Sequence, residues 1–182
     1  MKKTILTFGL ISGVFASLMM AATLPLEDKI GYDKSLVLGY TVIVLAFLMV
    51  FFGIRSYRDN NAGGQITFAR GFAIGISITL IMCVCYVVSW EIIYFNFMHD
   101  FMDKYAARII ERAKASGASA AALQAQMDAL NKQKQLYENP LYNSAMTFLE
   151  PFPVGLLITL ISAAVLRKKR QSKAAPEAIP AS

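Results

Sequence analysis

Four long apolar runs constrain this chain more than any other feature of its sequence. A bilayer core of about 30 Å takes about 20 helical residues to cross, and each run is long enough. Hydrophobic residues make up 56% of the chain and charged residues only 16%, too few for an ordinary soluble domain. The sequence therefore predicts an all-α polytopic membrane protein, a bundle of four transmembrane helices at about 4–24, 36–54, 71–97 and 145–166.

The distribution of lysine and arginine predicts how these spans are oriented. Cytoplasmic loops of membrane proteins carry an excess of both residues. With both termini inside, the inner segments hold ten cations and two acids, whereas the outer segments hold eight of each. We therefore expect both termini in the cytoplasm, the lipid bilayer as the main partner and no nucleic-acid partner. Residues 171–182 are expected to form a disordered cytoplasmic tail.

The polar segment between the third and fourth runs has a composition of its own. Residues 99–143 are rich in Ala, Gln, Lys and Glu, which favour helices, and apolar residues recur among them near helical spacing. Ser116-Gly117 is expected to end a first helix, and Ser119 can cap a second. The segment predicts an extracytoplasmic amphipathic αα-hairpin. Its apolar stripes either pack on each other, dock a second copy of the chain or a membrane or periplasmic partner, or form a lid over the outer mouth of the bundle.

Small residues recur at four-residue steps in three of the apolar runs. Lipid gives helices no hydrophobic reason to associate, so close backbone approach at small residues drives their packing. The expected helix-packing residues are Gly9, Gly13, Gly71, Gly75 and Gly155.

Two carboxylates lie inside the apolar runs. Glu91 is near the outer end of the third run, and Glu150 opens the sequence Glu150-Pro151-Phe152-Pro153 at the start of the fourth. A helix that begins at Pro153 and ends at Leu166 is only about 21 Å long, so the proline segment is expected to dip into the membrane. Glu91, Glu150, Pro151 and Pro153 then form a candidate proton or ion site. The alternative is a structural kink with Glu150 reaching the surface.

The sequence carries no visible catalytic machinery. It lacks H-E-x-x-H and G-x-S-x-G motifs, and its single histidine cannot build a multi-histidine metal site. Cys83 and Cys85 are two apart on a helix and are expected to be packing residues. We therefore expect no enzymatic activity, no cofactor and no metal.

Four segments together resemble a bacterial family known as domain of unknown function 4199. They are residues 51–59, 66–68, 101–105 and 147–155, the last of which reads Thr147-Phe148-Leu149-Glu150-Pro151-Phe152-Pro153-Val154-Gly155. The resemblance implies a small four-span protein of the inner membrane of a Gram-negative bacterium. It implies no activity and assigns no role to any residue.

Two functional hypotheses remain open at this point. The first is a non-enzymatic membrane protein, structural or partner-binding, that uses the outer hairpin and the small-residue faces as contact surfaces. The second is a small proton- or cation-coupled transporter or channel subunit that uses Glu91 and Glu150.

Overall fold

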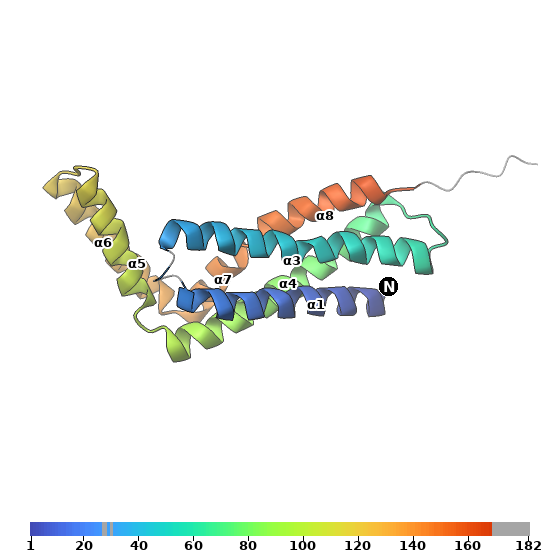
Figure 1. Ribbon diagram of the computed structural model, residues 1–182, viewed down its shortest axis with the longest axis horizontal. Coiled ribbons are helices and arrows are strands. Elements are labelled where there is room, and N and C mark those ends of the chain that lie inside the picture. Colours follow the sequence, from blue (N-terminus) through green and yellow to red (C-terminus); the bar gives the residue numbers. More distant parts are fainter. Residues whose placement is uncertain (27–28, 30, 169–182) are drawn as a thin grey trace, which may run out of the picture.

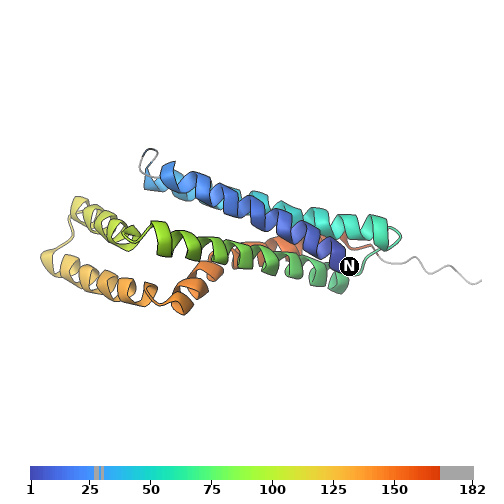
Figure 2. The same cartoon turned by 90° about the horizontal axis from the view of Figure 1, so that it is seen from below.

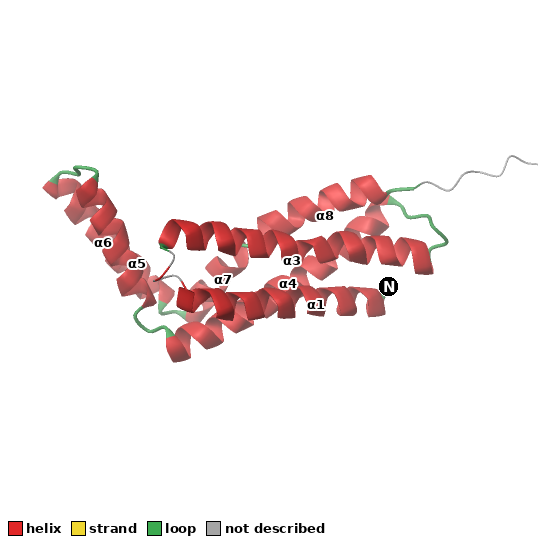
Figure 3. Ribbon diagram, in the orientation of Figure 1, coloured by secondary structure: helices red, strands yellow, loops and turns green. Residues whose placement is uncertain are grey.

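The computed structural model describes residues 1–26, 29 and 31–168, and every named element within them is a helix (Figure 3). In chain order the elements are α1 (Lys2–Thr23), the short 3-10 helix η1 (Leu24–Leu26), α3 (Tyr32–Asn61), α4 (Phe68–Phe97), α5 (Phe101–Ala115), α6 (Ala120–Tyr137), α7 (Pro140–Leu149) and α8 (Phe152–Leu166). The expected tail at 171–182 lies outside the described residues.

Four stretches are long and apolar enough to cross a membrane: α1, most of α3, α4, and the stretch Pro140–Leu166 that contains α7 and α8. The prediction of a helical chain with four such stretches is confirmed. Helices α1, α3, α4 and α8 lie side by side, and we call them the helical body (Figure 1). The start of α1, the α3–α4 connection and the end of α8 lie at one end, here called the terminal end. Helices α5 and α6 extend from the opposite end (Figure 1).

Small residues form the contact between α4 and α8. A Cβ atom built on Gly71 would lie 3.4 Å from the Ala163 Cβ, and one built on Gly75 would lie 2.8 Å from the Thr159 Cγ2. One further step along α4, the Thr79 and Thr159 hydroxyl oxygens lie 3.0 Å apart and share a hydrogen bond. The two helices run antiparallel and meet at every fourth residue, the geometry that small-residue steps permit.

Gly155 extends this contact to a third helix. A Cβ atom on Gly155 would lie 2.5 Å from the Cζ of Phe47 on α3 and 2.5 Å from the Cγ2 of Thr79 on α4. The Thr79 hydroxyl also donates a hydrogen bond to the Gly155 carbonyl oxygen, 3.4 Å away. The ring of Phe47 is fully buried. Three helices therefore meet at a point that has room only for a hydrogen atom.

The same principle joins α1 to α4, which run parallel. A Cβ atom on Gly9 would lie 2.9 Å from the Ile81 side chain, and one on Gly13 would lie 2.6 Å from the Cys85 Cβ. The Ser17 hydroxyl continues the series and donates to the Cys85 carbonyl oxygen at 3.4 Å. The structure thus places all five glycines of the expected packing set against a neighbouring helix.

Helix α3 supplies much of the buried core. The Ser12 hydroxyl of α1 donates a hydrogen bond to the Ala46 carbonyl oxygen of α3 at 2.7 Å, and both residues are fully buried. The largest buried apolar side chains of this core are Ile43, Phe47, Ile54, Ile74, Ile78 and Met82.

Helices α5 and α6 lie next to each other beyond the helical body (Figure 2). The turn between them contains Gly117, whose φ of 78° is the left-handed conformation that glycine adopts without strain. The Ser119 hydroxyl caps α6 by accepting a hydrogen bond from the Ala122 N–H at 3.3 Å. An ion pair between Asp103 on α5 and Lys134 on α6 links the two helices. The sequence predicts the end of a helix at Ser116-Gly117, and α5 ends at Ala115.

Helix α7 begins five residues before the expected start of the fourth span. The Asn139 side chain accepts hydrogen bonds from the N–H groups of Leu141 and Tyr142, and Pro140 occupies the first turn, where its missing N–H costs nothing. The expected boundary between the outer segment and the fourth span, near residue 143, therefore falls inside this helix. Asn139-Pro140 thus follows the end of α6 and begins α7.

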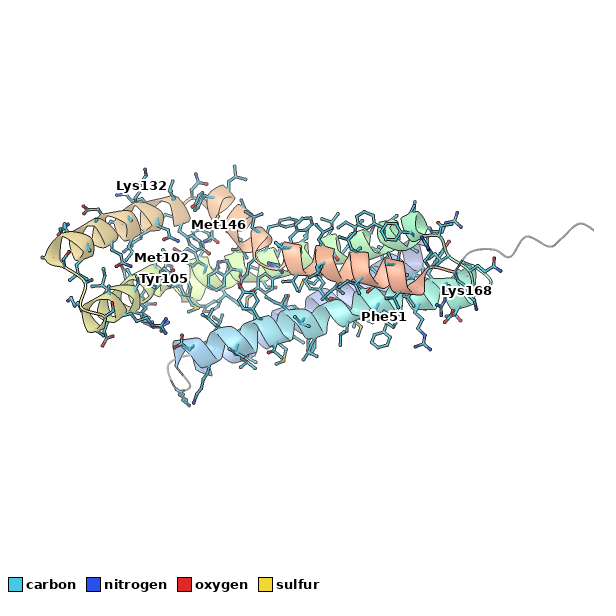
Figure 4. All side chains as sticks on the ribbon, turned by 90° about the horizontal axis from the view of Figure 1, so that it is seen from above. Phe51, Met102, Tyr105, Lys132, Met146 and Lys168 are labelled. Atoms are coloured by element: carbon cyan, nitrogen blue, oxygen red, sulfur yellow. The ribbon has the colours of Figure 1, made fainter. Side chains whose placement is uncertain are left out.

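At the terminal end of the body, backbone hydrogen bonds join the α3–α4 connection to the end of α8. The Ile66 N–H donates to the Lys168 carbonyl oxygen at 3.2 Å, and the Lys168 N–H donates back to Ile66 at 3.0 Å. Figure 4 shows Lys168 at this end, far from α5 and α6. The α3–α4 connection and the end of α8 are thereby held together.

Candidate functional site

The segment between α7 and α8 interrupts the last apolar stretch. Helix α7 ends at Leu149 and α8 begins at Phe152, with Pro153 in its first turn. Neither Pro151 nor Pro153 has an N–H to donate to the carbonyl group four residues earlier. Pro151 is fully buried and Pro153 is exposed. The short length of α8 is made up by α7, because the two helices together form the 27-residue stretch Pro140–Leu166.

A cavity of about 320 Å³ lies where the helical body meets α5, α6 and α7. Its walls come from α1, η1, α3 and α4 on one side. Helices α5, α6 and α7 and the residue Glu150 form the other side. Figure 4 shows two of its lining residues, Met102 and Tyr105, on the side of α5 that faces α6, whereas Lys132 points away from α5. The aromatic residues of its lining are Tyr40, Tyr86, Trp90, Phe101, Tyr105 and Tyr137.

Among the described residues that line the cavity, Glu150 has the only side chain that carries a formal charge. The Tyr86 hydroxyl on α4 donates a hydrogen bond to the Glu150 Oε2 at 3.4 Å. The other polar side chains on the walls are neutral, among them Ser35, Gln133 and Thr147. The structure therefore places Glu150 at a helix interruption and on the wall of a cavity, with its side chain exposed. Both the proton or ion site and the alternative, a structural kink with Glu150 at the surface, stay open.

Glu91 occupies a different environment. It is half-buried on α4, and its Oε1 accepts a hydrogen bond from the Ser144 hydroxyl of α7 at 3.0 Å. Glu91 does not line the cavity, whereas Tyr86 and Trp90 of the same helix do. The two carboxylates therefore have different partners, and the structure does not bring them together in this cavity.

Asn143 organises the wall of the cavity and was missed by the sequence analysis. It is fully buried, and its Oδ1 accepts hydrogen bonds from the Trp90 indole N–H at 2.9 Å and from the Thr147 hydroxyl at 3.2 Å. Its Nδ2 donates to the Tyr137 carbonyl oxygen at 3.3 Å. One amide thus ties α7 to α4 and to the end of α6. No local signal marks Asn143, because it lies at the end of the predicted polar segment 99–143 and contacts with other helices bury it.

Aromatic contacts hold the same region together. The Trp90 and Phe101 rings lie edge to face with centroids 5.0 Å apart, and the Tyr94 and Tyr137 rings do so at 5.4 Å. Burial raises the pKa of the Tyr137 phenol, so this group is neutral at physiological pH. Tryptophan and tyrosine favour the boundary between apolar and polar surroundings, which fits a cluster at one end of the body.

One hydroxyl on the cavity wall has no hydrogen-bond partner among the described residues. This group is the Ser35 Oγ, which is inaccessible to solvent. A buried hydroxyl without a partner costs free energy, and a bound ligand or water with a polar atom would remove that cost.

The remaining candidate residues are placed as follows. Cys83 is fully buried in the core, and Cys85 lies against Gly13 of α1. His99 is exposed at the end of α4. In the part of the chain that the structure describes, no three His, Cys, Asp or Glu side chains are gathered to hold a metal ion. The absence of a metal and of a cofactor stays a prediction.

Comparison with known proteins identifies a family. The family model described as "Protein of unknown function (DUF4199)" matches residues 7–168. No curated protein and no solved structure matches the chain. The matched region contains most of α1, the other three membrane-spanning candidates and the cavity, and it agrees with the resemblance noted at 147–155. The chain therefore belongs to this family of proteins of unknown function.

Proposed function

We propose that the protein resides in a bacterial inner membrane, with both termini in the cytoplasm and with α5 and α6 on the periplasmic side. The start of α1, the α3–α4 connection and the end of α8 share the terminal end of the body (Figure 1). Exposed cations lie there, including Lys2, Arg55, Arg70 and Lys168. Loops with such an excess of cations stay in the cytoplasm, which supports this orientation.

Single introduced cysteines test the orientation. In spheroplasts, a membrane-impermeant maleimide should label Ser116→Cys in the α5–α6 turn, whereas Asn61→Cys at the end of α3 should react only after permeabilisation. Both sites are exposed, so access is limited by the membrane. The native Cys83 and Cys85 lie within α4 and serve as an unlabelled background. The reverse labelling pattern would refute the orientation.

The second part of the proposal is that the protein acts by binding a small molecule and is not an enzyme. The observation that carries it is the cavity of about 320 Å³, which combines aromatic walls with one carboxylate and a few neutral polar groups. Ligand sites in proteins have this composition and volumes of about 300–1,000 Å³. The unpartnered Ser35 hydroxyl adds a polar group that a ligand can satisfy.

The sole tryptophan of the chain provides a local reporter, because Trp90 lines the cavity. Full-length protein in lipid nanodiscs is titrated with two brominated probes of equal shape, 4-bromobenzyltrimethylammonium and its neutral carbon isostere 1-bromo-4-neopentylbenzene. Bromine quenches tryptophan on contact. We expect saturable quenching by at least one probe and recovery of emission when its unbrominated analogue competes.

A cavity-filling variant provides the control. A Cβ atom on Gly39, which lines the cavity, would meet nothing within 4 Å, so Gly39→Phe can fill the space without a backbone clash. Gly39→Phe should abolish saturable quenching, and Gly39→Ala should retain it. Quenching that rises linearly with both probes and is equal in all variants would refute the binding proposal.

A small proton- or cation-coupled transporter is the second candidate function. The position of Glu150 on the cavity wall, next to a helix interruption, favours it because interrupted helices carry binding sites in many transporters. Four helices enclose little space, so this function would require an oligomer. The separate position of Glu91 argues against one site shared by both carboxylates.

The α5–α6 pair remains a candidate contact surface for a second copy of the chain or for a membrane or periplasmic partner protein. Exposed apolar side chains on α6, Met127 and Leu136, support this part of the proposal. Crosslinking through Ser116→Cys in intact membranes tests it. Recovery of the monomer alone would contradict it.

A further inference from the structure

The cavity described above has an unusual charge balance. Among the described residues of its lining, Glu150 is the only carboxylate, and none is a lysine, arginine or histidine. Among the described residues, no lysine or arginine forms an ion pair with Glu150, whose hydrogen-bond partner is the neutral Tyr86 hydroxyl. Glu150 is exposed, so a ligand can reach its carboxylate, and the described residues supply no cation to pair with it.

Aromatic side chains provide the second property of the site. Six of the lining residues are aromatic, and two of them, Trp90 and Phe101, are held edge to face at 5.0 Å. The faces of aromatic rings carry partial negative charge and attract organic cations, most strongly quaternary ammonium groups. Aromatic rings beside a single carboxylate are the combination that recognises such cations.

Other ligand classes fit the walls less well. A bare divalent cation such as Ca²⁺ takes six to eight oxygen ligands, and the described residues gather no cluster of acidic side chains around Glu150. An anion such as a fatty acid would be repelled by the carboxylate. A neutral hydrocarbon would fill the space and leave the charge of Glu150 uncompensated.

We propose that the cavity binds an amphipathic organic monocation, an amine or quaternary ammonium compound with an apolar group. Its ammonium group lies against Glu150 and the aromatic rings of Tyr86 and Trp90, and its apolar part fills the space beside Gly39. This inference rests on the proposed binding function and adds the charge and class of the ligand.

The ammonium group has two possible sources, a free compound that enters from the periplasm or the headgroup of a membrane lipid. Both present the same chemistry to the cavity. Nanodiscs of phosphatidylglycerol contain no ammonium group, whereas discs that include phosphatidylethanolamine do. If the headgroup is the occupant, phosphatidylethanolamine will weaken the apparent affinity of an added cation. If the source is a free compound, the affinity will be the same in both discs.

The test uses the two brominated probes in phosphatidylglycerol nanodiscs, with Trp90 quenching as the readout. The cation should bind wild-type protein at least about tenfold more tightly than its neutral isostere, because only the cation compensates Glu150. Glu150→Gln keeps the shape of the side chain and removes its charge, and it should remove this preference. Glu91→Gln is the matched control and should leave the preference unchanged, because Glu91 lies outside the cavity.

The outcomes separate this inference from the proposed function. Equal saturable binding of both probes to wild-type protein would overturn the cation assignment and leave the binding function intact. A preference for the cation that persists in Glu150→Gln would also overturn it. Failure of both probes to bind would refute both proposals. The comparison of the two probes on wild-type protein needs no variant, so it decides the question even if Glu150→Gln does not fold.

Discussion

The contact at Gly155 provides a sharp test of the packing described for the helical body. In Gly155→Ala, the new methyl group would lie 2.5 Å from both Phe47 on α3 and Thr79 on α4, about 0.9 Å inside an ordinary 3.4 Å contact. Neither neighbour can move easily. The Phe47 ring is fully buried, and the Thr79 hydroxyl is hydrogen-bonded to Thr159 and to the Gly155 carbonyl oxygen. The strain must therefore be relieved by separating the helices.

The matched control is Gly39→Ala on α3. Its new methyl group would meet nothing within 4 Å, so it changes the helix propensity without changing the packing. Alanine is favoured over glycine in a helix by about 1 kcal/mol, and this gain is common to both variants. Overpacking a tight site costs about 1–3 kcal/mol. We therefore expect Gly155→Ala to be less stable than Gly39→Ala by about 1–3 kcal/mol.

The assay is equilibrium unfolding in mixed micelles with an increasing fraction of sodium dodecyl sulfate, followed by far-ultraviolet circular dichroism. Comparing the two variants directly removes the propensity term and most effects of the detergent. If the two transitions coincide, the backbones at Gly155 are not in close contact, and the account of how α3, α4 and α8 pack is refuted.

Three further predictions follow from the other contacts. In Asn143→Ala, the buried Trp90 indole N–H loses its acceptor, so the free energy of unfolding in the same assay should fall by about 1–3 kcal/mol. An unchanged transition would contradict the hydrogen bonds described for Asn143. The hydrogen bond from Lys134 to Asp103 raises the pKa of the Lys134 amine above its usual value, so this contact should persist at lower pH and be lost as the pH rises through the raised value. Asp103→Asn should lower this pKa in a lysine-selective NMR titration, and an unchanged pKa would contradict the contact. If the protein is a coupled transporter, proteoliposomes should show a pH-dependent proton or cation flux. Glu150→Gln should abolish this flux and Glu91→Gln should not, because of these two carboxylates only Glu150 lines the cavity. Absence of any flux would exclude this function.

Sequence reasoning identified the features that depend on local composition. Apolar runs long enough to span a bilayer can be recognised from length and composition alone. Small residues at four-residue steps indicate which faces of the helices touch. The Gly71, Gly75 and Gly155 contacts follow from this pattern. Glycine and serine at the α5–α6 turn are equally local signals, because they act through their own backbone conformation and capping hydrogen bonds.

The cavity could not be predicted in the same way. Consecutive helical residues such as Trp90 and Glu91 point about 100° apart. Which of the two faces the cavity depends on how α4 is rotated relative to α1 and α7. Trp90 points to the cavity, while Glu91 points to Ser144. The role of Asn143 could not be predicted either, because its burial depends on contacts with α4 and α6 and not on its neighbours in the sequence. Depth in the membrane follows from counting residues, but the direction of a side chain around a helix depends on tertiary contacts.

The interruption between α7 and α8 has a mechanical consequence. Helix α8 is locked against α3 and α4 at Gly155, whereas Asn143 attaches α7 to Trp90 and to the end of α6. The proline pair removes ladder hydrogen bonds between these two anchored halves, so side-chain contacts and not a continuous helix hold α7 relative to α8. A displacement of α6 would therefore act on the cavity beside Trp90 through α7, with no continuous backbone ladder to carry it to the terminal end of the body.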